Sequence, residues 1–153
     1  MARYLSRADL SRIAGRYIEQ YYTRFGISKD APEPIDPERL ASSVLGLNVK
    51  MLPLCSDSSV LGLTVFQKCG FTVTLGDGTK LVEVFMPKDV VIDSALAADS
   101  CTGCRNFTIA HEAAHHILAD LFPNDYGKAV KCRGHIAYRE RNGKPSWEEW
   151  QAD

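Results

Sequence analysis

The sequence lacks the features that would direct it into a membrane, onto a nucleic acid or out of the cell. No apolar run approaches the ~20 residues that a bilayer-spanning helix needs, and the first residues lead into Arg7 and Asp9 instead of an apolar stretch with a cleavage site. A net charge of −1 over 153 residues gives no reason to expect a basic surface for nucleic acid or anionic lipid. Five cysteines, an odd number, cannot all pair within the chain. We therefore expect no signal peptide, no membrane contact and a location in the reducing cytoplasm.

The chain also has no internal repeat, no low-complexity tract and no evident helix-turn-helix pattern. Its composition is that of an ordinary globular protein, with 45% hydrophobic and 24% charged residues. A length of 153 residues is sufficient for one domain with a substantial core. We therefore expect a single domain over residues 1–153.

The first part of the chain carries the pattern of two helices. Apolar residues at i, i+3 and i+4 spacing predict a helix over Arg7–Phe25. Ser6 and Asp9 resemble a capping box at its start, and Gly26 is a natural stop. A second, shorter helix is expected over residues 37–46, because a proline suits its first position and a glycine its end.

Alternating apolar residues then predict a small sheet, followed by helices. The expected strands are 47–51, 61–65, 71–75, 81–86 and 90–92, and the third and fourth flank Gly-Asp-Gly, which predicts a hairpin. Asn106 can cap a helix that runs from Phe107 to about Leu121. Residues 123–145 are turn-rich and basic, and a further helix is expected to begin after Ser146. This order of elements indicates an α+β domain.

Residues 111–116 read His-Glu-Ala-Ala-His-His and carry the clearest chemical signal. Two helical residues four positions apart differ by about 40° in azimuth, so the imidazoles of His111 and His115 share one face and can bind the same zinc ion. Glu112 projects from an adjacent face and can reach a water molecule on that zinc. His116 lies about 100° from His115 and is not expected to join. The motif predicts a metal-dependent peptidase with Glu112 as the general base.

A third zinc ligand must come from another segment, because catalytic zinc usually takes three protein ligands and one water. The downstream candidates are Glu148, Glu149 and Asp153. Helical geometry alone does not choose between Glu148 and Glu149. Acidic residues in the first turn of a helix are also common as solvated partners of the helix dipole.

Two further groups of residues have possible roles. His135 or Tyr138 could donate to the tetrahedral oxyanion, although either fits an ordinary surface position. Cys101-x-x-Cys104 and Cys132-x-x-His135 have the spacing of a structural zinc site, and the alternative is four unrelated residues. The imidazole of His135 is not expected to be both an oxyanion donor and a ligand of the structural zinc site.

Two segments resemble the motifs of a known family. Residues 106–115 read Asn-Phe-Thr-Ile-Ala-His-Glu-Ala-Ala-His, and residues 149–153 read Glu-Trp-Gln-Ala-Asp. They resemble the zinc helix and the downstream Glu-x-x-Ala-Asn/Asp ligand segment of the ImmA/IrrE family of zinc metallopeptidases. The order of the preceding helices and small sheet is also similar to that family, so the resemblance covers most of the chain.

The resemblance implies a zincin-like α+β domain with N-terminal helices, a small mixed β-sheet, the His-Glu-x-x-His helix and a short C-terminal helix. It implies a Zn²⁺ ion bound by His111, His115 and Glu149, with Glu112 as the general base. It further implies an endopeptidase that cleaves a protein substrate, characteristically a DNA-binding transcriptional repressor. The net charge of −1 separately predicts no direct binding of nucleic acid.

The resemblance is incomplete at the carboxyl end. The family pattern continues with an apolar stretch, whereas this chain stops at Asp153, and so short a helix is marginal by itself. We therefore expect either a chain truncated at its C-terminus or a frayed helix end at Glu149, and both zinc affinity and activity depend on which of the two holds. The alternative function, from a different class, is a zinc-containing module that binds a protein without cutting it.

Overall fold

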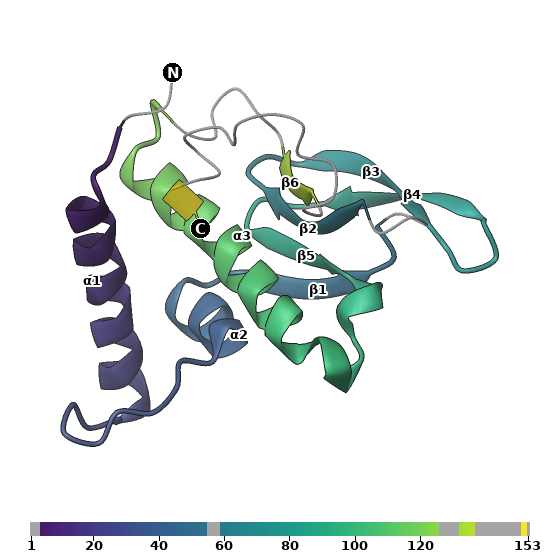
Figure 1. Cartoon of the computed structure of the whole chain (residues 1–153). Coiled ribbons are helices and arrows are strands. Elements are labelled where there is room, and N and C mark those ends of the chain that lie inside the picture. Colours follow the sequence, from purple (N-terminus) through teal and green to yellow (C-terminus); the bar gives the residue numbers. More distant parts are fainter. Residues whose placement is uncertain (1–3, 55–58, 126–131, 137–150, 153) are drawn as a thin grey trace.

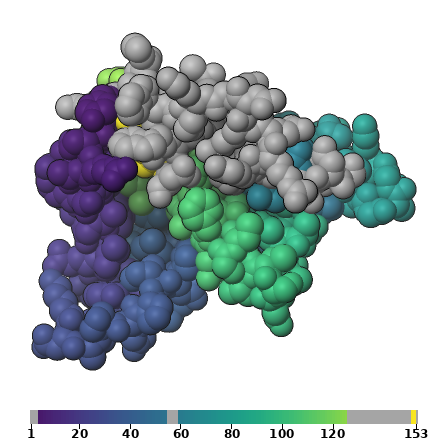
Figure 2. Space-filling model, in the orientation of Figure 1, coloured from purple at the N-terminus to yellow at the C-terminus, as the bar shows by residue number. Residues whose placement is uncertain are grey.

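The computed structural model describes residues 4–54, 59–125, 132–136 and 151–152, with the backbone alone for 132–136. The described chain is an α+β arrangement, as the sequence predicts. One long helix lies across a small mixed sheet, a second long helix flanks the first, and a two-stranded hairpin extends from the sheet (Figure 1) and projects from the body of the molecule (Figure 2). None of the helices in these ranges combines the length and the apolar character that a membrane span needs.

The helix α1 spans Arg7–Phe25, and both of its predicted ends are confirmed. The Ser6 hydroxyl accepts a hydrogen bond from the backbone N–H of Asp9 at 3.2 Å, while the Asp9 carboxylate accepts one from the backbone N–H of Ser6 at 3.1 Å. This reciprocal pair is a capping box, which satisfies donors that the first helical turn leaves open. Gly26 adopts the left-handed conformation, with φ +65°, and ends the helix.

The predicted second helix forms as two short pieces. One turn of α-helix, α2 (Pro37–Arg39), continues into a π-helical turn, η1 (Leu40–Val44). The carboxylate of Asp36 caps the first turn by accepting from the backbone N–H groups of Glu38 and Arg39. The segment therefore begins and ends close to the predicted positions but is not a uniform α-helix.

The central sheet has four strands in the order β1-β5-β2-β6. Strand β1 (Asn48–Leu52) pairs in parallel with β5 (Asp89–Asp93), which pairs antiparallel with β2 (Val60–Val65). The other edge of β2 pairs antiparallel with β6 (Cys132–Ile136). The predicted turn-rich stretch 123–145 thus contains a strand that the sequence analysis missed, because Cys-Arg-Gly-His-Ile has too few apolar residues to show an alternating pattern.

The predicted hairpin is confirmed. Strands β3 (Cys69–Thr74) and β4 (Lys80–Phe85) pair antiparallel as a separate two-stranded sheet. Asp77 accepts a hydrogen bond from the backbone N–H of Thr79 in the connecting turn, and Gly78 has a φ of +85°. The positive φ explains a glycine at that position.

Apolar clusters form on both faces of the central sheet, and the alternation of side chains along β5 decides which residues enter each. Val90 and Ile92 belong to the cluster that packs against the long helix, whereas Val91 belongs to the cluster that packs against the hairpin. The buried members of the first are Ala41, Leu47, Val90, Ile92, Leu96, Ile109 and Ala113. The buried members of the second are Leu54, Leu63, Val65, Val73, Phe85 and Val91.

The long helix α3 (Thr102–Leu121) carries the predicted zinc motif. Its predicted end at Leu121 is confirmed, but its predicted start is wrong, because the helix begins at Thr102 and Asn106 lies inside it. A 3-10 turn, η3 (Asp99–Cys101), leads directly into the helix, and the Thr102 hydroxyl donates to the Asp99 carbonyl at 2.7 Å. Continuous helical backbone through this turn leaves no non-helical position for Asn106 to act as a cap.

Candidate metal centre on helix α3

His111 and His115 lie one turn apart on α3, and their Nε2 atoms are 3.1 Å from each other. Both side chains are buried, with 1% and 2% of their surface exposed. Two nitrogen ligands at about 2.05 Å from a tetrahedral zinc ion lie about 3.3 Å apart. The spacing and the chemistry of the two imidazole nitrogens therefore fit two ligands of one zinc ion.

Glu112 is fully buried on the side of α3 that faces β2. The Thr64 hydroxyl on β2 donates to Oε2 of Glu112, and its oxygen also lies 3.1 Å from the main-chain carbonyl oxygen of Glu112. Gly62 lies beneath the same side chain: an ideal Cβ at this position would be 2.6 Å from Oε1 of Glu112. The carboxylate is thus enclosed next to the histidine pair by a strand far away in the sequence.

Of the predicted third ligands, Glu148, Glu149 and Asp153 all lie outside the described residues. Within the described ranges, no group of three or more His, Cys, Asp or Glu side chains that could hold a metal ion is found. Gln151 and Ala152 are described, and both are buried. They line a crevice of about 310 Å³ together with Leu10 of α1 and with Ala114, Ile117 and Leu118 of α3.

His116 is buried between α3 and the sheet rather than among the other two imidazoles. Its ring packs edge-on against Phe66, with the centroids 5.3 Å apart. Burial lowers the pKa of His116 from 6.5 to about 4, although a hydrogen bond with the Asp89 backbone and the charge of Asp120 act in the opposite direction. The imidazole is therefore neutral near pH 7.

The two residue pairs predicted to form a structural zinc site lie on different elements of the fold. Cys101 packs against the cluster between α3 and β5, and Cys104 is exposed on the first turn of α3. In β6, the backbone of Cys132 pairs with Val65 and that of His135 pairs with Gly62. The side chains of Cys132 and His135 and the whole of Tyr138 lie outside the described residues, so the structural zinc site and the oxyanion donor stay predictions.

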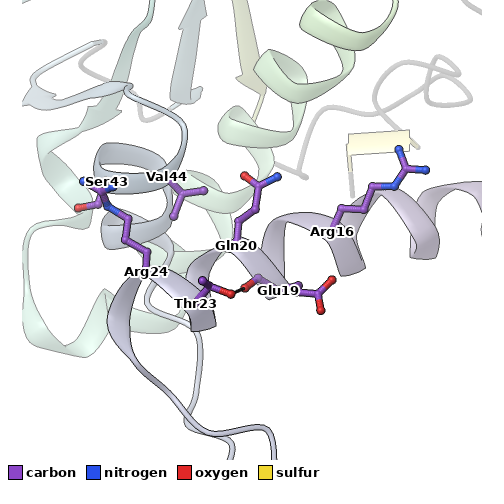
Figure 3. Close-up of a pocket in the computed structure, with 7 residues that line it drawn as sticks. All are labelled: Arg16, Glu19, Gln20, Thr23, Arg24, Ser43 and Val44. Atoms are coloured by element: carbon purple, nitrogen blue, oxygen red, sulfur yellow. Dashed lines mark hydrogen bonds between the residues drawn. The ribbon is translucent and has the colours of Figure 1, made fainter.

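A groove of about 680 Å³ lies between α1 and η1 (Figure 3). Neither histidine of the pair lines it. Its walls combine polar and apolar surface, and none of the predicted site residues lines it. Glu19 in the groove is paired with Lys29 at 2.5 Å. The lining residues are Arg16, Glu19, Gln20, Thr23, Arg24, Ser43 and Val44.

Sequence reasoning missed Thr64 and Gly62, the two residues of β2 that enclose Glu112. An isolated glycine within a strand pattern often marks the close approach of another segment, so Gly62 carried a usable signal. Thr64 carried none, because a threonine is ordinary in a strand. Comparisons of the chain with models of protein families, with curated proteins and with solved structures find no match in any of the three.

Proposed function

We propose that the protein is a zinc-dependent endopeptidase with its site on α3. The observation that carries this proposal is the approach of two buried imidazole nitrogens to 3.1 Å, beside a fully buried carboxylate, in the order His-Glu-x-x-His. Buried titratable groups that converge in this way are uncommon unless they serve a site. The position of this helix across a mixed sheet supports the zincin-like fold that we propose for the chain.

We propose Glu149 as the third ligand. The support comes from the resemblance of residues 149–153 to the ligand segment of the ImmA/IrrE family, and from the two described residues that follow Glu149. Gln151 and Ala152 line the same crevice as Ala114 and Leu118 of α3, which are neighbours of His115 along the helix.

In the proposed reaction, each group of the chain has a separate task. His111 and His115 hold the ion through Nε2 and must be neutral to do so. A bound zinc ion supplies Lewis acidity, which polarises the scissile carbonyl and lowers the pKa of a water molecule. Glu112 takes the proton from the attacking water and passes it to the leaving amine. The burial of all three side chains excludes bulk water and strengthens these interactions.

The proposed substrate is a protein, and the resemblance to the ImmA/IrrE family favours a DNA-binding transcriptional repressor. Cleavage of such a substrate would take place in the cytoplasm, in agreement with the odd cysteine count. The net charge of −1 supports recognition of the repressor itself rather than of its DNA.

Metal analysis combined with one substitution tests this function. We expect purified protein to hold zinc at one ion per chain and to cleave fluorescein-labelled casein until a chelator is added. Glu112→Gln should keep the zinc and lower the rate at least ~100-fold, because general-base catalysis contributes 10²–10⁴-fold. Glu33→Gln, at an exposed loop position, is the matched control and should leave both properties unchanged.

Two results would overturn the peptidase proposal. The first is a wild-type chain that binds no zinc. The second is a zinc-loaded wild-type chain that cuts no faster than Glu112→Gln, which would favour a zinc-containing module that binds a protein without cutting it.

A further inference from the structure

Two residues of β2 meet the side chain of Glu112, although neither belongs to the zinc motif. We propose that Thr64 and Gly62 form a seat that fixes the Glu112 carboxylate in one position, with Thr64 as a positioning residue for the general base. This inference rests on the proposed peptidase function. It adds a requirement for activity outside α3, at Thr64 of β2, which lies 48 residues before Glu112 in the sequence.

The alternation of side chains along β2 places the two residues of the seat on the same face of the strand. Leu63 and Val65 enter the cluster beside the hairpin, so Gly62 and Thr64 fall on the opposite face of the strand, which α3 covers. Thr64 and Glu112 are both completely buried. Their hydrogen bond is therefore shielded from water, and hydrogen bonds are stronger in the protein interior than in water. A bond to an ionised acceptor is also stronger than one between neutral groups.

The hydroxyl of Thr64 determines the direction of the carboxylate. It has one hydrogen, which it donates to Oε2, and its oxygen lies 3.1 Å from the main-chain carbonyl oxygen of the same glutamate. The bond to Oε2 links the end of the Glu112 side chain to β2, while the contact with the carbonyl oxygen, which has no hydrogen of its own, only places the hydroxyl beside the Glu112 backbone. A glutamate otherwise retains several rotatable bonds, so this link removes most of its freedom.

Gly62 provides the space that this conformation needs. A Cβ at position 62 would lie 2.6 Å from Oε1 of Glu112, 2.9 Å from its Cγ and 2.7 Å from Cγ2 of Thr108. Thr108 has little freedom to move away, because it is buried and its hydroxyl donates to the Cys104 carbonyl at 2.8 Å. Gly62 is not among the glycines with positive φ, so its backbone tolerates alanine and the conflict is with the side chains of Glu112 and Thr108.

The seat matters because general-base catalysis depends on geometry. A displacement of about 1 Å in a positioned group can cost about 100-fold in rate. Loss of the hydroxyl or addition of a methyl group at the seat should therefore reduce turnover while His111 and His115 still bind zinc. A purely structural threonine would instead affect stability, and the rate per folded molecule would not change.

Four variants test the seat. Thr64→Val keeps the shape and loses the hydroxyl, Thr64→Ser keeps the hydroxyl, and Gly62→Ala adds the methyl group. Thr72→Val, on the exposed side of β3, controls for the loss of a threonine hydroxyl, and Gly103→Ala in α3, where a Cβ meets nothing within 4 Å, controls for an added methyl group. Each protein is crystallised with zinc, its zinc content is measured, and cleavage of labelled casein is followed.

We expect Thr64→Val and Gly62→Ala to retain one zinc per chain, to show Glu112 in a changed rotamer and to lose at least ~10-fold in turnover. Thr64→Ser should keep the original rotamer and most of the turnover. An unchanged Glu112 rotamer in both Thr64→Val and Gly62→Ala overturns the seat, whether or not the protein cuts casein. The peptidase proposal fails separately, through absent zinc or an ineffective Glu112→Gln. If Thr64→Val does not fold, the Glu112 rotamer in Gly62→Ala tests the seat by itself, because this variant removes no polar group.

Discussion

Lys50 on β1 donates to the buried carboxylate of Asp89 on β5, with Nζ 2.7 Å from Oδ2. The same carboxylate accepts from the backbone N–H of Met86 at 2.9 Å and from the side-chain amide of Asn48 at 3.3 Å. Burial by itself would raise the pKa of Asp89, but the bonds from Lys50, Met86 and Asn48 outweigh it and hold the pKa below its ordinary 3.8. A single carboxylate thus joins the parallel pair β1–β5 to the turn before β5.

This carboxylate should make part of the stability dependent on pH. Because the pKa of Asp89 is lower in the folded chain than in the unfolded chain, its contribution is complete above about pH 5 and is lost as the pH falls below 4. Asp89→Asn should therefore lower the free energy of unfolding by about 1–3 kcal/mol at pH 7 and by less at pH 3. Urea denaturation at pH 7 and at pH 3 measures the difference between the two losses in free energy of unfolding. Asp30→Asn, at an exposed loop position, is the control, and an equal effect of Asp89→Asn at both values would contradict the prediction.

Zinc should stabilise the folded chain through the proposed ligands. A ligand that binds only the folded state at 100 times its Kd adds about 2.7 kcal/mol to the free energy of unfolding. We expect zinc to raise the Tm of the wild type and of Glu148→Gln, and to raise that of Glu149→Gln and His115→Ala much less. Differential scanning fluorimetry with and without zinc measures this. A larger loss in Glu148→Gln than in Glu149→Gln would transfer the third-ligand role to Glu148.

The cluster between α3 and the sheet should depend on Ile109. This side chain is 2% exposed and packs with the cluster that contains Val90 and Ile92. Ile109→Ala leaves a cavity and should lower the free energy of unfolding by about 2–5 kcal/mol. Leu121→Ala, at a side chain that is 40% exposed on the same helix, should cost clearly less. Equal losses in urea denaturation would show that the cluster does not fix α3 on the sheet.

The capping box should contribute to the stability of α1. Replacing Ser6 with alanine removes the acceptor for the Asp9 backbone N–H and should cost about 1 kcal/mol. Ser11→Ala, at an exposed position inside the same helix, removes a hydroxyl without removing a cap and should not destabilise the protein. Thermal unfolding followed by circular dichroism distinguishes the two. A Tm for Ser6→Ala at or above that of Ser11→Ala would contradict the role of the cap.

Local signals explain the parts of the fold that the sequence predicts correctly. The capping box at Ser6, the left-handed Gly26 and the turn around Gly78 each depend on a few neighbouring residues. The approach of His111 to His115 is of the same kind, since four-residue spacing on a helix is enough to bring the rings together.

Long-range contacts explain what the sequence did not show. β6 is a strand because β2 offers it an edge, and Cys-Arg-Gly-His-Ile gives no strand pattern by itself. The contact of Thr64 with Glu112 joins residues 48 positions apart, which no local pattern encodes.

The order of strands in the central sheet determines when the protein can fold during synthesis. β1 and β2 do not pair with each other; each pairs with β5, which is made after both. Until Asp89–Asp93 has left the ribosome, the nascent chain therefore carries two strands whose shared partner is missing, and only local elements such as α1 and the β3–β4 hairpin have their pairing partners. During that interval the apolar residues of β2 are open to chaperones and to other nascent chains.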